Sequence, residues 1–422
     1  MKLKKTMILA VAFLMVLAVF ACKGTTQPTG TPAGNEQPSG TTQQNAGNEN
    51  PAQTQQNEPT EEQSWFAQNL DDGSQTEEEL YELAKAEGKV VIYSISSRME
   101  TAADSFKEKY PGIEVEVSNM KTDVVKEKVL TEYKAGVKNC DVVHVTDLDG
   151  ALYTEYVAGG VMKSYYPTGI LSKIDLSKYN LDTAFPLYYE LTQWFYNFEL
   201  CPDGVDVDSW WDLTRPEWKG KLLMNNLLTN QDYIAQFAAF AEFADELAAD
   251  YEREFGEKIT YTCGKENAGY ELVYRLLNND PIFTASSDEA IESVGADGVT
   301  EIKLAWGPSS KVRNNEKKGW HIAPLNMTPK VGVPKPNNLY VVNECLHPNA
   351  AKLFIRFICG GEDGTSPGFD PFNTLGGWPL RSDVTPAEGS IPLSEIPLWP
   401  NNPAFVYMEK PDMEDFIMNI LG

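Results

Sequence analysis

Residues 76–146 alternate between segments with apolar residues at helical spacing and short runs of strand type. Thr76 and Glu79 have the spacing of a capping box, which predicts a helix that ends at Gly88. The β-branched run at 89–95 predicts a buried strand. Further helices are predicted at 96–110 and 122–135, and further strands at 113–117 and 140–145. This order indicates a mostly parallel sheet with helices on both faces.

The pattern continues less regularly in the second half of the chain. Predicted strands lie at 221–224, 281–285 and 339–342, and predicted helices at 233–255, 269–277, 288–294 and 348–359. From residue 360 the chain is rich in Gly and Pro, and we expect an irregular cover over the core. No repeat of solenoid type is present. The alternation of helices and strands therefore predicts the α/β fold class.

The first residues have the pattern of a secretory signal. Three lysines precede the uncharged apolar run at 7–21, which is shorter than the roughly 20 residues that a membrane-spanning helix needs. Residues 19–22 (VFAC) resemble the bacterial lipobox, in which the cysteine becomes the lipidated first residue of the mature chain. We predict a signal peptide at 1–21 and a lipid anchor at Cys22. A short membrane anchor that stays uncut is the alternative.

The segment that follows Cys22 has the composition of a disordered chain. Between residues 23 and 64 there is no Val, Ile, Leu, Met or aromatic residue. Such a segment cannot bury enough apolar surface to offset its ordering entropy. We therefore predict a disordered spacer over 22–75 and a folded domain over 76–422, exported and held in the cell envelope by the lipid.

Composition and motifs exclude several functions. The chain has 35 basic and 61 acidic residues, a net charge of −26, which argues against nucleic-acid binding through clustered Lys and Arg. The five cysteines after Cys22 form no CxxC pair, and their odd number leaves at least one thiol unpaired within the chain. No HExxH or GxxxxGK[ST] motif is present, so we predict no enzyme and no cofactor.

Polar residues follow several predicted strands, where ligands bind in open α/β sheets. Helix N-termini at these ends carry free N–H groups and a partial positive charge, which suits anions. The candidate ligand residues are Ser96, Ser97, Arg98, Thr122, Thr229, Asn230, Ser286, Ser287, Ser310 and Arg313. Their hydroxyl and amide groups could instead be plain helix caps, and the arginines ordinary surface charges. Their grouping in so acidic a chain favours a site for a phosphate or carboxylate.

Trp194 offers a different kind of contact. Trp194, Trp210 and Trp211 lie close together in the sequence near the middle of the chain. Their rings could form an aromatic wall that holds a sugar or an aliphatic ligand. Packing in the core is the alternative. We keep Trp194 among the candidate ligand residues.

Several stretches resemble the extracellular solute-binding proteins of ABC importers, in their ferric-type branch. They are LYELAKAEGKVVIY (80–93), FKEKYPGIEV (106–115), DVVHVTD (141–147), WWDLTRPEWKGKLLM (210–224) and HPNAAKLFIRF (347–357). The resemblance implies the type II periplasmic-binding-protein fold, with two α/β lobes, each a mostly parallel sheet with flanking helices, and crossovers near 188–197 and 322–326. Lobe one would span about 76–190 and 325–422, and lobe two about 195–322. A monomer would capture a small solute between the lobes and deliver it to an ABC permease in the membrane.

The resemblance also raises iron as a ligand. Ferric-binding members use an adjacent Tyr pair in lobe two, which we would expect at 305–315, where this chain has no Tyr. The Tyr pairs at 165–166 and 188–189 precede lobe two, and we expect them to pack near the lobe junction. The polar and cationic candidate residues favour a small organic anion as the ligand, either a sugar phosphate or a carboxylate. We predict no metal site. Ferric iron or an iron chelate is the alternative. A secreted glycan-active enzyme or a surface adhesin is the alternative of another class.

Overall fold

The computed structural model describes residues 64–70, 74–175 and 184–422. The predicted signal peptide, Cys22 and most of the predicted spacer lie outside the described residues. No helix in these three ranges has both the length and the apolar character needed to cross a membrane.

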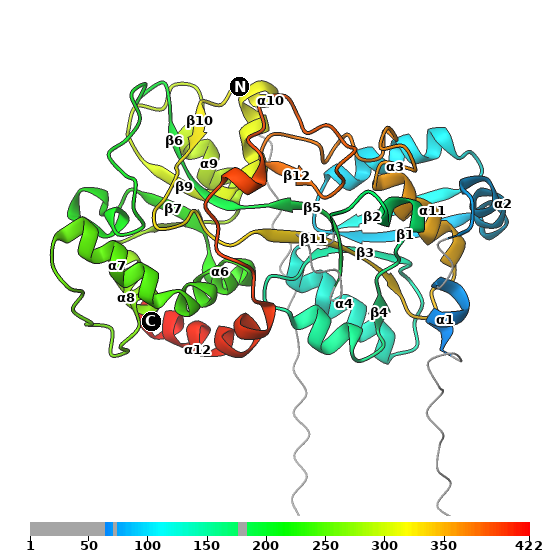
Figure 1. Ribbon diagram of the computed structural model, residues 1–422, viewed down its shortest axis with the longest axis horizontal. Coiled ribbons are helices and arrows are strands. Elements are labelled where there is room, and N and C mark those ends of the chain that lie inside the picture. The colour runs from blue at the N-terminus through cyan, green and yellow to red at the C-terminus, as the bar shows by residue number, and fades with distance from the viewer. Residues whose placement is uncertain (1–63, 71–73, 176–183) are drawn as a thin grey trace, which may run out of the picture. The chain divides into compact units, whose positions relative to one another are not determined.

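Two mixed sheets organise the described residues (Figure 1). The first has the order β12-β5-β11-β3-β1-β2, with β4 paired to β11, and we call the part built on it lobe one. Its strands are β1 (Lys89–Ser94), β2 (Glu114–Asn119), β3 (Val142–Thr146), β4 (Met162–Lys163), β5 (Phe185–Glu190), β11 (Lys335–Val342) and β12 (Gly377–Pro379). The second sheet, in lobe two, has the order β10-β6-β9-β7-β8. Its strands are β6 (Thr192–Asn197), β7 (Leu222–Asn225), β8 (Ile282–Thr284), β9 (Leu304–Pro308) and β10 (Ile322–Pro324).

Helices flank both sheets. Those of lobe one are α1 (Trp65–Leu70), α2 (Glu77–Glu87), α3 (Arg98–Lys109), α4 (Thr122–Lys134), α5 (Thr168–Leu171) and α11 (Pro348–Ile358). Those of lobe two are α6 (Gln231–Glu242), α7 (Ala244–Phe255), α8 (Ala268–Leu277), α9 (Ser287–Gly295), α10 (Asn314–Lys318) and α12 (Pro403–Leu421). One short π-helical segment is η2 (Leu152–Val157), and the short 3-10 helices are η3 (Asp212–Thr214), η4 (Pro216–Trp218), η5 (Leu227–Thr229), η6 (Ser309–Arg313) and η7 (Leu393–Glu395).

The elements predicted between residues 76 and 146 are confirmed, with small shifts at their ends. The capping box is present: the backbone N–H of Glu79 donates to Thr76 Oγ1 (3.2 Å), and that of Thr76 donates to Glu79 Oε2 (2.9 Å). Strand β1 pairs in parallel with both β2 and β3. The carboxyl ends of these strands therefore lie at one edge, followed by the N-termini of α3 and α4.

Three predictions were wrong in detail. The predicted helix 233–255 is two helices, α6 and α7, because the chain turns at Phe243, whose ring stacks on Trp399 (4.9 Å between ring centroids). The segment after residue 360 is not wholly irregular, since it contains β12 and the helix α12. Helix α1 falls in the range predicted as spacer, and it folds with lobe one because Phe66 and Leu70 are buried.

The lobes are joined by two crossovers. Strand β5 ends at Glu190 and β6 begins at Thr192, so Leu191 alone separates the two sheets there. The second crossover runs from β10 to β11. The first lies within the implied range 188–197, whereas the second runs over 325–334, because residues 322–324 of the implied range 322–326 form strand β10 of lobe two.

The last helix belongs to lobe two, although the predicted range 325–422 assigned it to lobe one. Val406, Met413 and Ile417 of α12 are buried in the core of lobe two, against α6 and α8. In Figure 1 this helix lies below α6, beside α8. Pro411 inside the helix and several acidic residues interrupt its apolar pattern, which explains why the sequence did not predict it.

A loop of lobe one forms a third, non-covalent joint with lobe two. Leu148, just after β3, is buried in the core of lobe two. The carboxylate of the next residue, Asp149, accepts from Lys126 Nζ of α4 (3.1 Å) and from Lys410 Nζ of α12 (2.7 Å). Gly150 lies so close to Pro403 that a Cβ atom there would be 2.8 Å from it. The start of α12 is thus fixed to both lobes.

Aromatic side chains fill the core of lobe two. Trp306 of β9 is fully buried and stacks on Trp194 (5.8 Å between ring centroids) and on Phe237 (5.0 Å). Tyr233 meets the same indole edge-on at 4.8 Å. Offset and edge-to-face contacts of this kind add to the stabilisation from area burial alone.

The five cysteines after Cys22 are all free thiols. Cys140, Cys201, Cys345 and Cys359 are buried, and Cys263 is half-buried. They behave as small apolar side chains rather than as cross-links.

Candidate ligand-binding site

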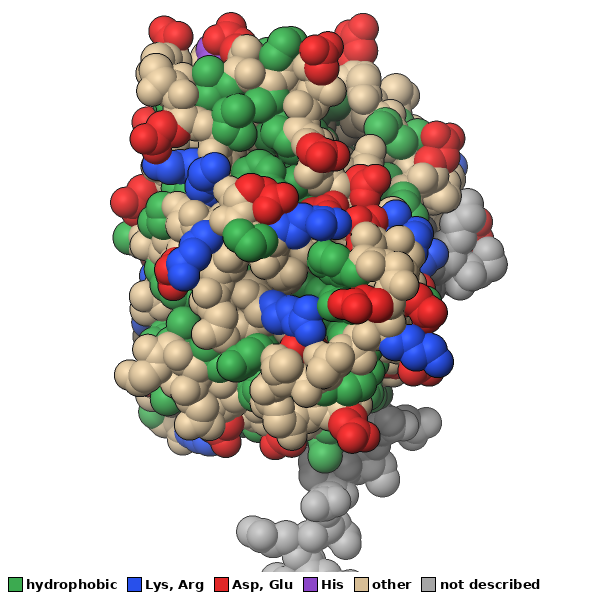
Figure 2. All heavy atoms as spheres, turned by 90° about the vertical axis from the view of Figure 1, so that its left-hand side faces the viewer, with side chains coloured by type: hydrophobic (Ala, Val, Ile, Leu, Met, Phe, Trp, Pro, Cys, Tyr) green, Lys and Arg blue, Asp and Glu red, His purple; other side chains and the backbone are tan. Residues whose placement is uncertain are grey.

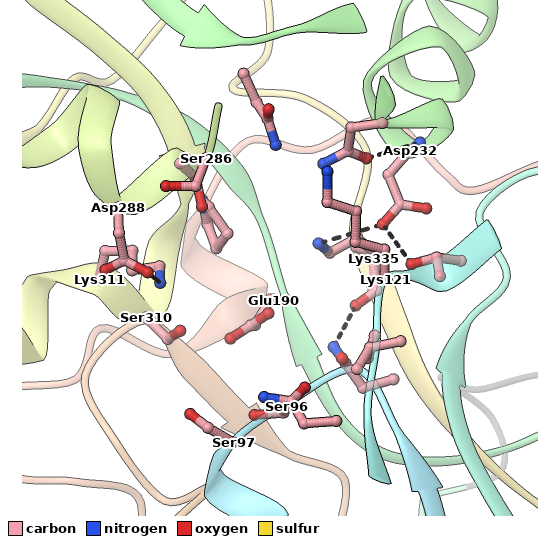
Figure 3. Close-up of a pocket in the computed structure, with 18 of the residues that line it drawn as sticks. Ser96, Ser97, Lys121, Glu190, Asp232, Ser286, Asp288, Ser310, Lys311 and Lys335 are labelled. Atoms are coloured by element: carbon pink, nitrogen blue, oxygen red, sulfur yellow. Dashed lines mark hydrogen bonds and ion pairs between the residues drawn. The ribbon is translucent and has the colours of Figure 1, made fainter. Parts of the chain in front are cut away.

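A cavity of about 470 Å³ lies between the two lobes. Its walls are the carboxyl ends of β1, β2, β7 and β8, the following helix starts, and residues of β5 and β11 next to the crossovers (Figure 3). The lining side chains are Ile95, Ser96, Ser97, Arg98, Asn119, Met120, Lys121, Thr122, Asp123, Tyr188, Glu190, Asn225, Thr229, Asn230, Asp232, Ala285, Ser286, Ser287, Asp288, Pro308, Ser310, Lys311, Arg313, Lys335 and Asn337.

The structure brings together every predicted ligand residue except Trp194. Lobe one contributes Ser96, Ser97, Arg98 and Thr122; lobe two contributes Thr229, Asn230, Ser286, Ser287, Ser310 and Arg313. Trp194 is wrong as a ligand residue. It is fully buried and stacked on Trp306, so packing in the core is its role.

Some of these polar groups also cap helices, as the alternative interpretation proposed. Asn230 Oδ1 accepts from the backbone of Asp232 (3.2 Å) at the start of α6. Ser286 Oγ accepts from Glu289 (3.2 Å) at the start of α9. By contrast, Ser97 makes no side-chain capping bond to α3. Capping therefore accounts for part of the polar lining and leaves other hydroxyls available.

A buried ion pair stands at the base of the cavity. Arg98 Nη2 donates to Glu190 Oε1 (2.8 Å) and to the hydroxyl of Tyr188 (2.6 Å). The side chains of Arg98 and Glu190 are only 11% and 6% exposed. Arg98 Nη1 is buried without a hydrogen-bond partner among the described residues. The arginine is thus held rigidly and keeps donor capacity next to the cavity.

Neighbouring charges perturb the titration of this group. Burial alone would raise the pKa of Glu190. The positive charges of Arg98 and, to a smaller extent, Lys335 outweigh this effect and lower that pKa to about 2. Burial, and then repulsion from Arg98, lowers the pKa of Arg313. Burial also lowers the pKa of Lys311, which pairs with Asp288 (2.7 Å). Glu190 is therefore ionised throughout the physiological range.

A second polar group spans the lobes at the other side of the cavity. Asp232, at the start of α6 in lobe two, accepts from Thr146 Oγ1 of lobe one (3.0 Å). Lys335 Nζ lies 3.9 Å from the same carboxylate. Burial and the nearby charge of Asp232 raise the pKa of Asp123. This side of the cavity offers mainly acceptor groups.

The family assignment rests on a match to a family model. The model of the bacterial extracellular solute-binding proteins matches residues 101–404. The chain belongs to this family. It is an exported solute-binding protein of the type that serves ABC importers.

The solute-binding protein has the fold of solved two-lobe periplasmic binding proteins. Iron-bound HitA from Pseudomonas aeruginosa superposes with a TM-score of 0.60 at 15% identity, covering 79% of this chain and 99% of that chain. AfuA from Actinobacillus pleuropneumoniae, with fructose 6-phosphate bound, gives 0.59 at 16% identity, covering 79% and 97%. A ferric binding protein from Campylobacter jejuni gives 0.56 at 16% identity, covering 78% and 99%. A comparison with curated protein sequences gives no match.

Several cavity residues of the solute-binding protein were not predicted from its sequence. Glu190, the last residue of β5, and Lys335, the first residue of β11, are charged and lie opposite each other in the β5–β11 pair. Asn225 and Asn337 are also strand residues. A buried charge inside an otherwise apolar strand such as FPLYYE is the signal that could have identified Glu190.

The tyrosine pairs are packed, and only Tyr188 reaches the cavity. Tyr165 is buried in the core of lobe one, and Tyr166 packs against that core. Tyr188 lines the cavity, but its hydroxyl is bonded to Arg98, and burial raises its pKa. Within the described ranges, two groups of three potential metal ligands occur, Glu199–Asp297–His321 and Asp208–Asp212–Glu254, and neither lines the cavity.

Residues 364–368 (GTSPG) match the G-x-S-x-G pattern of a hydrolase nucleophile elbow. A nucleophile elbow joins a strand to a helix and exposes its serine, whereas this stretch follows α11 and Ser366 is buried. Ser366 Oγ has no hydrogen-bond partner within the described part of the chain. The stretch is therefore not a catalytic elbow.

Proposed function

We propose that this protein captures a small organic anion, a sugar phosphate or a carboxylate, in the cavity between its lobes and delivers it to an ABC permease. The observation that carries the proposal is the gathering of cationic side chains at the cavity of a strongly acidic protein. Five cationic side chains line it, against four carboxylates, while the whole chain has a net charge of −26. On the lobe-two face in Figure 2, acidic and basic side chains are interspersed.

Arg313 is the group best suited to meet an anion. It donates through Nη1 to the hydroxyl of Ser310 (2.9 Å), and no carboxylate of the described residues lies within ion-pair distance of it. The starts of α3, α4, α6 and α9 surround the same cavity, and the partial positive charge at each helix start favours an anion. A phosphate or carboxylate could accept from the guanidinium and gain from these dipoles.

An organic anion fits this cavity better than ferric iron does. A ferric site needs several anionic oxygen ligands, and the hydroxyl of the single tyrosine in the lining, Tyr188, already accepts a hydrogen bond from Arg98. The solved relatives include both chemistries, since AfuA holds fructose 6-phosphate and HitA holds iron. The guanidinium groups of Arg98 and Arg313 favour a phosphate-bearing or carboxylate-bearing ligand over iron. We propose no catalytic role.

Titration calorimetry on ligand-stripped protein tests the proposal. We expect Arg313→Ala to weaken the binding of fructose 6-phosphate or citrate about tenfold or more, because a charge-assisted contact contributes about 1.5–3 kcal/mol. Lys107→Ala, which removes an exposed cation of α3 outside the cavity, is the matched control and should leave the affinity unchanged. Tight binding of ferric ion with a tyrosinate charge-transfer band, and none of the organic anions, would contradict the proposal.

We also propose that the mature protein is held in the envelope by a lipid on Cys22. Replacing Cys22 with serine should move the protein from the detergent phase to the aqueous phase in phase partitioning, because a hydroxyl cannot take the thioether-linked lipid. Cys263→Ser is the control and should stay with the detergent. If Cys22→Ser also stays there, an uncut apolar anchor holds the protein instead.

A further inference from the structure

Glu190 is a carboxylate at the centre of a site built to attract anions. It is the last residue of β5 and lies between Lys335 of β11 and Gly377 of β12. In Figure 3 its carboxylate lies in the cavity between Ser310 of lobe two and Ser96 of lobe one. A negative group in this position needs a functional explanation, because it repels the negative charge that the surrounding cations attract.

The bonds of Glu190 fix both its orientation and its charge. One oxygen, Oε1, accepts from Arg98 Nη2 (2.8 Å). Burial raises the pKa of this carboxylate, whereas the charges of Arg98 and Lys335 and the nearby Ser310 hydroxyl lower it. An ionised carboxylate can only accept hydrogen bonds. Any ligand group that hydrogen-bonds to Glu190 must therefore be the donor.

This requirement restricts the ligand. An anion whose oxygens carry no proton would place an acceptor against the acceptor oxygens of a carboxylate whose side chain is only 6% exposed, and the lost hydration of the two groups would not be recovered. An anion with a neighbouring O–H or N–H group would satisfy Glu190 and meet Arg98 and Arg313 with its charge. A site built to receive a hydroxyl discriminates strongly against an analogue that lacks it.

We propose that Glu190 is the specificity-determining residue of the cavity: it selects anions that also donate a hydrogen bond and rejects anions that only accept. The inference rests on the proposed function and narrows its ligand class to hydroxyl-bearing or partly protonated anions. Sugar phosphates, hydroxy acids and hydrogen phosphate belong to this class, whereas sulfate and carboxylates without a hydroxyl do not.

Two matched pairs of probes test this selection in the unmodified protein. Citrate and tricarballylate differ by one hydroxyl group, and at neutral pH the tetrahedral phosphate ion carries one or two protons whereas the tetrahedral sulfate ion carries none. At equal ionic strength, calorimetry should show the donor-bearing member of at least one pair binding about a hundredfold or more tightly. Similar affinities for both members of each pair would overturn the inference and leave the proposed function standing. Absence of binding by every organic anion would overturn the proposed function as well.

The variant Glu190→Gln then assigns the selection to this residue. Its amide keeps the size of the side chain and can donate as well as accept, so the ratio of affinities within the pair should fall to about threefold or less. Glu116→Gln is the matched control, because Glu116 is also a strand carboxylate paired to a cation, Lys89 at 2.6 Å, but lies outside the cavity. Circular dichroism checks that each variant is folded. A folded Glu190→Gln that keeps the wild-type ratio would overturn the assignment, and the wild-type probe pairs decide the selection if the variant does not fold.

Discussion

Replacing Arg98 with methionine should lower the free energy of unfolding by about 3–5 kcal/mol, because it leaves the buried carboxylate of Glu190 without its ion-pair partner. The same change removes the donor to the Tyr188 hydroxyl (2.6 Å). Methionine fills much of the space of the arginine side chain, so the loss reports charge and hydrogen bonding more than volume. Chemical denaturation followed by circular dichroism measures the effect.

The double variant Arg98→Met/Glu190→Gln is the control for this result. With both charges gone, no uncompensated ion is buried, and we expect at least half of the lost stability to return. If the single variant costs under about 1 kcal/mol, or the double variant is no more stable than the single one, the ion pair does not have this role.

The pH dependence of stability gives a second measurement on the same variant. The folded-state pKa of Glu190, about 2, lies below its ordinary value of 4.5. Its contribution to stability is therefore complete above pH 4.5 and is lost as the pH falls towards 2. Burial raises this pKa, and without Arg98 less opposes that rise. The acid transition of Arg98→Met should accordingly begin at a higher pH than that of the wild type.

Replacing Trp306 with alanine should also cost about 3–5 kcal/mol, because the indole is the centre of the aromatic core of lobe two. The substitution would leave Trp194, Phe237 and Tyr233 without their common neighbour. Denaturant unfolding, followed by circular dichroism to avoid the changed fluorescence, measures the loss. A free energy within about 1 kcal/mol of the wild-type value would contradict this description of the core.

Trp194→Phe is the matched control for Trp306→Ala. The indole N–H of Trp194 is buried without a hydrogen-bond partner among the described residues, so its removal leaves no acceptor unpaired. Phenylalanine keeps an aromatic ring at this position, and the loss should stay below about 1.5 kcal/mol. Ligand affinity should not change, since Trp194 does not line the cavity.

The sequence predicted the first half of lobe one well because its signals there are local. A capping box, a left-handed glycine at Gly88 and β-branched runs determine helix and strand without help from distant residues. The candidate site followed from one topological rule, that ligands lie beyond the carboxyl ends of parallel strands. That rule found Ser96, Arg98 and Ser286, which come directly after strands.

What the sequence did not predict depends on contacts between distant segments. Glu190 and Lys335 are cavity residues only because β5 and β11 pair beside the crossovers. The break at Phe243 accompanies stacking on Trp399, over a hundred residues later in the chain. Trp194 was misassigned because an aromatic residue near a crossover can face either the cavity or the core, and only its partner Trp306 decides between them.

The position of α12 has a consequence for how the newly made chain folds. Lobe two takes its sheet from the middle of the sequence but completes its core with Trp399, Met413 and Ile417, at the very end. Trp399 lies 5.4 Å from Phe240 between ring centroids. During synthesis, Phe240 must therefore wait for more than 150 further residues before it gains this neighbour. The core of lobe two therefore cannot be completed until residues on both sides of the second crossover, as far as Ile417, have been made.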